Sequence, residues 1–557
     1  MDDLTKNTSH RPVFLFQEGY FTEPDFLKRF DNDMRRIRHM IFGNQDRELV
    51  KEMFNQYMGM CFQKVKDEPI VIHMLLESYE TLAYYGERYS SFETFENIIR
   101  DIEQRERKAL LFGKCPGKAK IVYGSILLKY YGLKNDQNNG WYSEEAFSVL
   151  AKAKFYLLRA YTQSLDTSNP LDSADQAYCL VLLSACFLLL SRYFEPSYYL
   201  ELLRRDHPND SNYEYITARN LEALKERTCL DYNGQLLLKI IDCCESLLKR
   251  SNIEPRLKEQ AVAIRTKCFQ DIENTNLTMD RLRRHKLKVE TSTKKRNAYF
   301  LYCIDHQLFL NEHALFCPCT RSVGDKLEIR TQHPHTQMPW VEKFTRILEL
   351  LMVDFALARN NLFQAESQKQ TAGFYKTESK IVNALQLKKD ALLKNAFKMC
   401  YSILDQIAHG TFEVLDIDIE KHLGSIAAIE GKPRQQLYFL NMWELYQFKE
   451  EDFRNNVYLV TLKSISRDLD RNKYSALNSF KMLRNAMEHK FLVIDDGQNA
   501  GKGSSTEQYI TREALIGKTK TLMVLTKSAI FSFTYLVRRQ SKIKEIAAKQ
   551  ANPDQSQ

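Results

Sequence analysis

The residues best suited to chemistry in this sequence lie close together near its C-terminal end, at Arg484, Asn485 and His489. An imidazole can take up or release a proton near neutral pH, and a guanidinium can bind an anion through several donors. On a helix, Asn485 and His489 are four residues apart and project together, while Arg484 is long enough to swing toward them. The same helix carries an apolar stripe on another side, formed by Tyr474, Leu477, Phe480, Leu483, Met487 and Phe491.

The spacing of these three residues does not identify a site when it is taken alone. An Arg and a His five residues apart occur in many proteins, and a solvated helix face is the simpler interpretation of polar side chains on a helix. Three polar groups on one surface would still be available to a second protomer that meets the first there. The sequence around the segment has to decide between these interpretations.

A second group of residues has the right chemical types for a zinc site, but its spacing is poor. Two cysteines separated by one residue hold zinc less well than a Cys-x-x-Cys pair, and no second cysteine pair follows. We therefore expect ordinary side chains here, with no bound metal and no cofactor elsewhere in the chain. The residues concerned are His313, Cys317, Cys319, His333 and His335.

The composition indicates a globular, helical protein of two or three domains. The chain has 557 residues, which is too long for a single hydrophobic core. Glycine (19) and proline (13) are scarce, and 44% of the residues are hydrophobic, which favours helices over a sheet with many tight turns. We predict an all-α fold. The net charge of +9 is compatible with a nucleic-acid partner but does not establish one.

The distribution of apolar residues and cysteines predicts a soluble, cytoplasmic protein without membrane contact. The twelve cysteines follow no regular framework, and several lie in apolar helical runs where a free thiol behaves as a small hydrophobic group. The N-terminus is polar and has no signal-peptide core. The most apolar stretch, 177–190, is shorter than the roughly 20 residues that a membrane helix needs.

The N-terminal half contains successive pairs of amphipathic helices. After an extension at 1–66, apolar residues recur at three- and four-residue spacing through 67–280, which is the helical period. The segment 177–199 is similar to a tetratricopeptide (TPR) unit, because small Ala185 would allow close helix contact and Glu195-Pro196 would open the second helix. We predict a TPR-like repeat region at 67–280. An irregular helical domain without repeats is the alternative.

The C-terminal half is predicted to contain a linker, a bundle and a tail. Residues 281–336 form the linker, which begins with a basic stretch at 281–296. Such a charge run is usually a solvated surface, and phosphate contact is the sharper alternative. Long helical patterns at 337–545 predict a four- to five-helix bundle, with one helix running from about 377 to 409 and another from 474 to 494. A disordered tail is expected at 546–557.

With this context, the C-terminal region resembles the HEPN superfamily of helical-bundle ribonucleases. That superfamily is marked by an Arg, often followed by Asn, with four to six residues before a His, and this chain has Arg484, Asn485, three residues and His489. The segments KMCYSILDQIAH, SISRDL, KSAIFSFTYLV and LYCIDHQLFLNEHALF also look like the TPR-fused HEPN family of bacterial, often defence-associated proteins. The resemblance covers about 295–545 well, and the N-terminal half by architecture.

The resemblance implies metal-independent cleavage of RNA, in which the ribose 2′-OH attacks the adjacent phosphate. His489 would be the acid or base, Arg484 would clamp the phosphate, and Asn485 would orient the His or the phosphate. Asp405 is a candidate for holding Arg484 or His489 from another helix. A simple surface or capping carboxylate is the other interpretation of Asp405.

HEPN sites are commonly composite across a two-fold axis, so the resemblance also implies a homodimer formed through the C-terminal bundle. The expected partners are RNA and possibly a protein or trigger on the repeats, and the expected biological role is that of a toxin or defence effector. The alternative is a non-catalytic TPR scaffold whose bundle only dimerises or binds RNA.

Overall fold

The computed structural model of the chain describes most of its length, with gaps at both ends and in several connections. The chain divides into two compact units. Unit 1 contains 1–141 and 148–175, and unit 2 contains 142–147 and 176–557. The described ranges are 26–42, 47–64, 68–107, 116–137, 142–164, 171–208, 210, 212–227, 233–251, 253, 255–274, 278–284, 298–317, 322–329, 338–367, 374–376, 381–430, 436–470, 477–489, 491–495 and 507–551.

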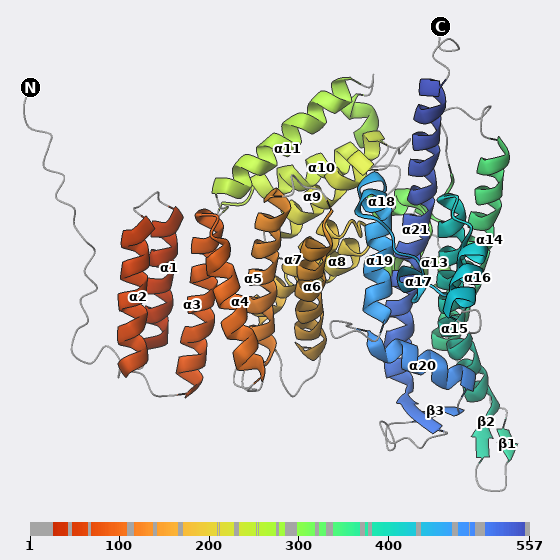
Figure 1. Ribbon diagram of the computed structural model, residues 1–557, viewed down its shortest axis with the longest axis horizontal. Helices are drawn as coiled ribbons and strands as arrows, with labels where there is room; N and C mark the ends of the chain where they lie inside the picture. The colour runs from red at the N-terminus through yellow and green to blue at the C-terminus, as the bar shows by residue number, and fades with distance from the viewer. Residues whose placement is uncertain are drawn as a thin grey trace, which may run out of the picture. The chain divides into compact units, whose positions relative to one another are not determined.

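Unit 1 is built of helices that follow one another side by side (Figure 1). Helix α3 contacts α1, α4 and α5, and α1 also contacts α2, so alternate helices of the chain are neighbours. This arrangement is typical of stacked helix pairs. The helices are α1 (Phe26–Phe42), α2 (Arg47–Lys64), α3 (Glu68–Arg88), α4 (Phe92–Arg107), α5 (Pro116–Gln137) and most of α6 (Glu144–Ser164).

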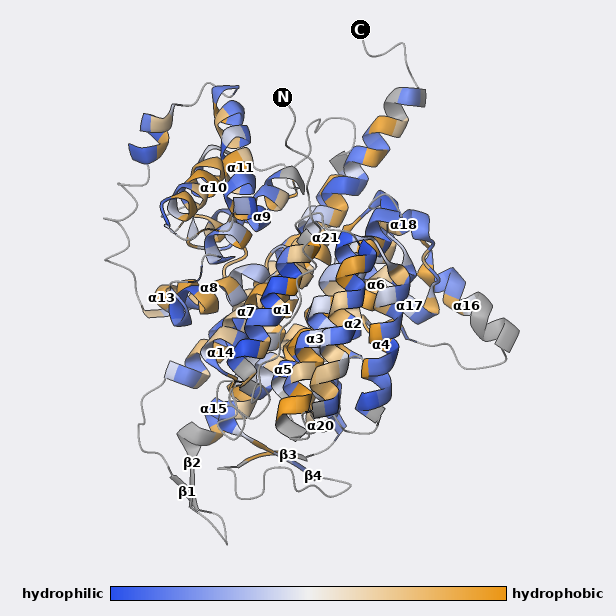
Figure 2. Cartoon of the chain, turned by 90° about the vertical axis from the view of Figure 1, so that its left-hand side faces the viewer, coloured by the Kyte–Doolittle hydropathy of each residue, from blue (hydrophilic) through white to orange (hydrophobic). Residues whose placement is uncertain are grey.

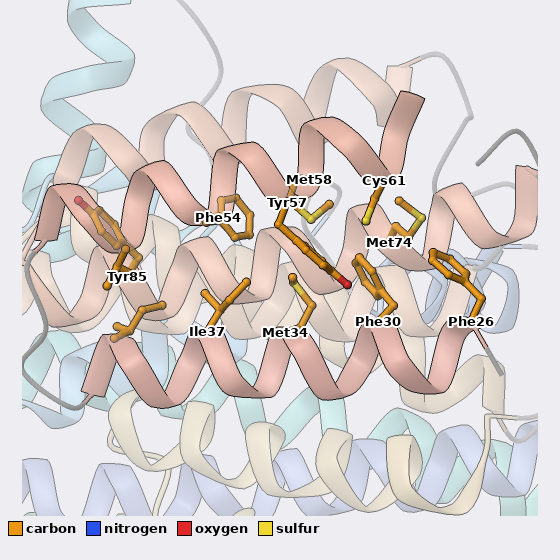
Figure 3. Packing of buried hydrophobic residues seen from close by; sticks show 12 residues of the cluster. Phe26, Phe30, Met34, Ile37, Phe54, Tyr57, Met58, Cys61, Met74 and Tyr85 are labelled. Atoms are coloured by element: carbon orange, nitrogen blue, oxygen red, sulfur yellow. The ribbon is translucent and has the colours of Figure 1, made fainter. Parts of the chain in front are cut away.

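A continuous apolar cluster joins the first three helices of unit 1 (Figure 3). Helix α1 places apolar residues at three- and four-residue spacing on one face, and α2 and α3 cover that face. Since α1 and α2 lie within the segment 1–66 that was predicted as an extension, these two helices share a core with the first predicted repeat. The cluster contains Phe26, Phe30, Met34, Ile37, Ile41, Val50, Phe54, Tyr57, Met58, Cys61, Met74 and Tyr85.

The first part of unit 2 continues with shorter helix pairs. Helix α8 begins at Pro196, where the sequence predicted a second repeat helix, and Ser191 with a φ of 58° makes the preceding turn. Helix α9 contacts both α8 and α10, and α10 contacts α11. The helices are α7 (Ser173–Leu189), α8 (Pro196–Asp206), α9 (Asn212–Arg227), α10 (Asn233–Leu248) and α11 (Pro255–Glu273).

The second part of unit 2 is a helical bundle around the 40-residue helix α21. Helices α14, α15 and α19 all contact α21, α14 contacts α15, and α20 contacts α15 and α19 (Figure 1). Its elements are α13 (Ala298–Asp305), η2 (Glu312–Leu315), α14 (Met338–Ser367), α15 (Ala384–Val414), α16 (Ile419–Glu430), α17 (Met442–Leu445), α18 (Glu450–Asn455), α19 (Tyr458–Leu469), α20 (Asn478–His489) and α21 (Arg512–Ala551).

Helix α21 is buried on all sides in its middle, where most residues are apolar or carry small hydroxyl groups. The buried Lys527 is an exception, and its Nζ donates to the Gln307 carbonyl. The Oγ of buried Ser528 has no hydrogen-bond partner among the described residues. Four other buried hydroxyls are satisfied within the helix, because each donates to the carbonyl four residues earlier. These donors are Thr519, Thr526, Ser532 and Thr534. Despite this apolar character, no helix in the described part of the chain is long and apolar enough to cross a membrane.

The all-α class is confirmed, but two short strand pairs interrupt the helices. Because of these strands, two helices have other borders than predicted. The helix expected from about 377 begins at Ala384, after β1 (Phe374–Lys376) and β2 (Ile381–Asn383), which pair antiparallel. The helix expected through 494 ends at His489, because the apolar, partly β-branched run of β3 (Phe491–Asp495) pairs in parallel with β4 (Glu507–Thr511). Figure 2 shows β3 as mainly hydrophobic and β4 as more hydrophilic.

The compact units follow other borders than the predicted domains. The predicted repeat region at 67–280 is divided between the two units, and its second part belongs with the bundle. Helix α21 continues to Ala551, so it enters the segment 546–557 that was predicted as a disordered tail.

A buried arginine joins the α7–α8 turn to α19 inside unit 2. The Arg192 guanidinium is fully buried and donates to both oxygens of Glu195, to Asp468 at 2.5 Å and to Ser464 at 3.1 Å. Burial opposes its charge, but the two carboxylates outweigh this effect and raise the pKa of Arg192. The helix pair next to the bundle is therefore fixed to α19 through a fully paired ionic cluster.

We predict that breaking this cluster strongly destabilises unit 2. Arg192→Ala leaves two buried carboxylates without their common partner, which costs about 3–5 kcal/mol in the free energy of unfolding. Denaturant titration of the full chain measures this cost. The control is Arg204→Ala, since Arg204 pairs with Glu201 at an exposed position and should lose only about 0–1 kcal/mol. Equal effects of the two substitutions would contradict the prediction.

Candidate functional site

Helix α20 carries the Arg-Asn…His segment, and its apolar face fixes it to the bundle. Phe480, Leu483 and Ala486 are buried, and the Phe480 ring lies 5.8 Å from that of Phe397 on α15. Asn485 and His489 are exposed, as the predicted stripe required. The buried face thus holds the backbone, and two of the three polar side chains remain accessible.

The third polar side chain, Arg484, is turned toward α15. Its Nη2 donates to Asp405 Oδ2 at 3.0 Å, and its Nε donates to Glu488 Oε1 at 3.3 Å. The guanidinium also lies over two aromatic rings, 5.1 Å from the centroid of Tyr401 and 5.8 Å from that of Tyr438. Only 19% of the side chain is exposed. Among the described residues its Nη1 has no hydrogen-bond partner, so one donor group stays available for an anion.

Asp405 on α15 has hydrogen bonds to both of its carboxylate oxygens. Oδ1 accepts the backbone N–H of Phe439 at 3.0 Å, and Oδ2 accepts from Arg484. Burial raises the pKa of Asp405, and the opposing effects of Phe439 and Arg484 do not cancel this shift. Of the two partners considered from the sequence, Asp405 contacts Arg484, and no contact with His489 is found among the described residues.

Glu488 links Arg484 to His489, and the sequence analysis did not select it. One carboxylate oxygen accepts from Arg484 Nε, and the other lies 3.9 Å from Nε2 of His489. The His489 side chain is 75% exposed. The sequence could have predicted the contact between Arg484 and Glu488, because residues four positions apart lie on the same face of a helix. Asn485 is exposed on the same helix.

An open cleft adjoins the Arg484–Asp405 pair. It has a volume of about 530 Å³ and is lined by two leucines together with polar residues from α15, α16 and the segment after α16. The Tyr438 side chain, which Arg484 also contacts, is 39% exposed at its wall. The polar lining residues are Asp405, His409, Glu420, Gln436 and Tyr438.

Residues 335–540 match the family model described as LA2681-like HEPN. These residues form a HEPN domain. The match contains Asp405, the whole of α20 and most of α21, so the network of Arg484, Glu488 and His489 lies within the domain. The helix pairs that precede it are consistent with TPR-like repeats. No curated protein and no solved structure matches the chain.

Two lysines attach α20 and the following strand to the rest of the HEPN domain, and an arginine links α21 to α15. Lys394 Nζ donates to the carbonyl of Leu492 in β3 at 2.6 Å, and Lys518 Nζ donates to Ser479 at the start of α20 at 3.0 Å. Burial lowers the pKa of both lysines. Arg512, at the start of α21, pairs with Asp390 on α15. Both ends of α20 are therefore held by neighbouring helices.

The residues weighed as a zinc site are described only in part. His313 and Cys317 are buried, and the His313 ring packs against Phe316. Cys319, His333 and His335 lie outside the described residues. In the described part of the chain, one potential metal cluster occurs, formed in unit 1 by Asp31, His73 and Glu77. Since Glu77 is already paired with Arg38 at 2.7 Å, a cation there would compete with a guanidinium.

We predict that the two carboxylates contribute unequally to holding Arg484. In a double-mutant cycle, Arg484→Ala with Asp405→Ala should give a coupling of about 1 kcal/mol or more, because the pair is well shielded from solvent. Arg484→Ala with Glu488→Ala should give only about 0.3–0.5 kcal/mol, as for other four-residue helix pairs. Denaturant titration of the single and double variants measures both couplings. Equal couplings would show that Glu488 is as firm a partner as Asp405.

Proposed function

We propose that the HEPN domain is a metal-independent endoribonuclease whose chemistry is carried by Arg484 and His489. The observation that supports this most directly is the carboxylate of Glu488, which lies next to both the guanidinium of Arg484 and the imidazole of His489, while Asp405, the other partner of Arg484, lines an open cleft. A proton-transfer group and an anion-binding group next to each other are what phosphodiester cleavage through the ribose 2′-OH requires.

In the proposed reaction, the 2′-oxygen forms a bond to phosphorus and the bond from phosphorus to the 5′-oxygen breaks. A base takes the proton of the 2′-OH, and an acid gives a proton to the leaving 5′-oxygen, so the products are a 2′,3′-cyclic phosphate and a 5′-OH. His489 acts in one of these proton transfers. Arg484 binds the nonbridging oxygens and stabilises the charge that develops on them. Asn485 orients the phosphate or the imidazole.

The two carboxylates around Arg484 are assigned different roles. Asp405 keeps the guanidinium in place through a hydrogen bond that is shielded from solvent. Glu488 occupies the side of the guanidinium nearest His489, where a phosphate would bind. An incoming phosphate thus displaces the Glu488 carboxylate from Arg484. The guanidinium is paired with an anion both before and after the phosphate binds.

We predict that the purified protein cleaves single-stranded RNA in the presence of EDTA and leaves a 2′,3′-cyclic phosphate. His489→Ala should lower the rate by about 10²–10⁴-fold, because it removes a proton-transfer group, while its exposed position leaves the free energy of unfolding nearly unchanged. Gel electrophoresis with end-group analysis measures cleavage. His39→Ala is the matched control, since His39 is an exposed histidine in the last turn of α1.

Strict dependence on a divalent metal, or equal cleavage of single-stranded DNA, would contradict this chemistry. RNA binding without any cleavage would favour the alternative of a non-catalytic scaffold. We also propose the role of a toxin or defence effector in the cell. Growth arrest on expression that disappears with His489→Ala is the corresponding cellular readout.

A second copy of the chain would complete the site. Within one protomer, the network of Arg484 and Glu488 contains one imidazole, that of His489, whereas the reaction uses both a base and an acid. We therefore propose a homodimer through the C-terminal bundle, in which two Arg484–His489 pairs share one cleft, while the repeats remain free to bind a protein partner or trigger.

We predict that two inactive variants complement each other in this dimer. When Arg484→Ala and His489→Ala protomers are mixed and allowed to exchange, part of the ribonuclease activity should return, because mixed dimers contain one intact pair of groups. Light scattering at micromolar concentration should give the mass of two chains. A monomer with full activity would refute the shared site.

A further inference from the structure

We propose that Lys527 is a pH-sensitive contact inside unit 2, and that uptake of a proton by its amine loosens α21 from the segment between α13 and η2. This inference goes beyond the proposed ribonuclease function and does not depend on it. It is carried by the burial of the amine, by its hydrogen bond to a neutral carbonyl and by the ion pair beside it.

The Lys527 amine lies where three parts of unit 2 meet. Its Nζ donates to the carbonyl of Gln307, which follows α13, and Nε2 of Gln307 donates to the Ser197 carbonyl in α8 at 3.5 Å. One turn further along α21, the ring of Phe531 stacks on that of Phe194, with the centroids 3.9 Å apart. A change at Lys527 therefore affects contacts of α8, of the segment after α13 and of α21.

Burial makes this amine costly to charge. Only 4% of Lys527 is exposed, and the adjoining cavity has a volume of about 10 Å³, which is at the lower limit for one water molecule. The Phe531 ring lies 5.7 Å from Nζ, but its attraction for a cation is small compared with the hydration that a buried ammonium loses. The Gln307 carbonyl accepts a hydrogen bond without bringing a negative charge. The neutral amine is therefore the form that this environment favours.

The charged groups nearest to Lys527 do not restore its charge. Asp325 attracts an ammonium there and Arg359 repels it. Both oxygens of Asp325 already accept from Arg359, at 2.9 and 2.8 Å, and Oδ1 also accepts the Leu310 N–H at 2.8 Å. Burial lowers the pKa of Lys527 to about 7, because Asp325 offsets only part of this effect and Arg359 adds to it.

Two other titratable groups line the same cavity, and both keep their protonation state while Lys527 changes its own. Burial and the charge of Lys520 lower the pKa of His306 below that of an ordinary histidine, so its ring is neutral above about pH 7. Burial raises the pKa of the Tyr198 hydroxyl, which therefore retains its proton. Among the described groups that line the cavity, Lys527 is the one that changes charge between about pH 7 and pH 9.

The direction of the pH effect follows from the lowered pKa of Lys527. Its pKa is about 7 when the contact is closed and the ordinary lysine value of 10.5 when the contact opens to water. Between these values the open form binds a proton that the closed form lacks, so the ratio of closed to open molecules rises about tenfold per pH unit. Below about pH 7 both forms are protonated, and the closed contact is at its weakest.

Hydrogen exchange of the backbone amides at 306–310 tests this proposal in the full chain. These amides donate within the segment or to Asp325, and their protection reports opening. Wild-type protein and Lys527→Met, which retains an apolar side chain of similar length, are compared at the same pH, so that the intrinsic exchange rate cancels. The ratio of wild-type to variant protection should rise about 50-fold between pH 7 and pH 9, and about twofold between pH 6 and pH 7.

The control is Lys520→Met, two turns earlier on α21, where the lysine pairs with Glu366 at 2.7 Å and its side chain is 32% exposed. Its ratio to wild type should stay constant within about twofold from pH 7 to pH 9, because a lysine with a carboxylate partner in contact with solvent remains charged there. If the ratio of wild type to Lys527→Met is also independent of pH, the amine does not titrate in this range and the proposal is overturned, whatever the size of the constant difference.

Discussion

The burial of one positive charge constrains much of unit 2. Arg192 is enclosed without solvent, so its guanidinium must be paired on nearly every side, and Glu195, Ser464 and Asp468 provide that pairing. These partners come from the turn before α8 and from α19. A small rotation between these elements would leave a buried charge unpaired, which costs far more than loss of an apolar contact. Apolar packing would allow several arrangements of the same helices, whereas this cluster allows few.

The position of α19 then influences the position of α20, the helix that contains Arg484 and His489. Helix α19 contacts both α20 and α21, and α20 also packs against α15. Asp405 on α15 and Arg484 on α20 meet only if these helices keep their distance and register. Arg484 is therefore positioned by a series of packed elements that includes the α7–α8 turn, α19 and α20.

The fold class was predictable from the sequence because helical periodicity and scarce turn residues are local signals. The exposure of Asn485 and His489 also followed from the apolar stripe of α20. The length of α20 did not, since a helical pattern and the short strand β3 look alike over a few apolar residues. The direction of the Arg484 side chain could not be predicted either. A long side chain can contact several partners, and only the tertiary structure shows which of them lie near it. Asp405 was a candidate from the resemblance, and its contact with Arg484 became visible in the structure, whereas Glu488 was overlooked within the motif itself.

The strand after α20 has a consequence for the imidazole at its end. His489 is the last residue of the helix, and terminal helical turns normally fray, so that a side chain there samples many positions. Here the chain enters β3 at Phe491, where it pairs with β4 and is bonded at Leu492 by Lys394. The final turn is thus anchored from beyond its own end. Because the backbone at His489 is already fixed, binding of a ligand there would order only the side chain. The loss of conformational entropy on binding is therefore smaller than for a histidine on a frayed helix end.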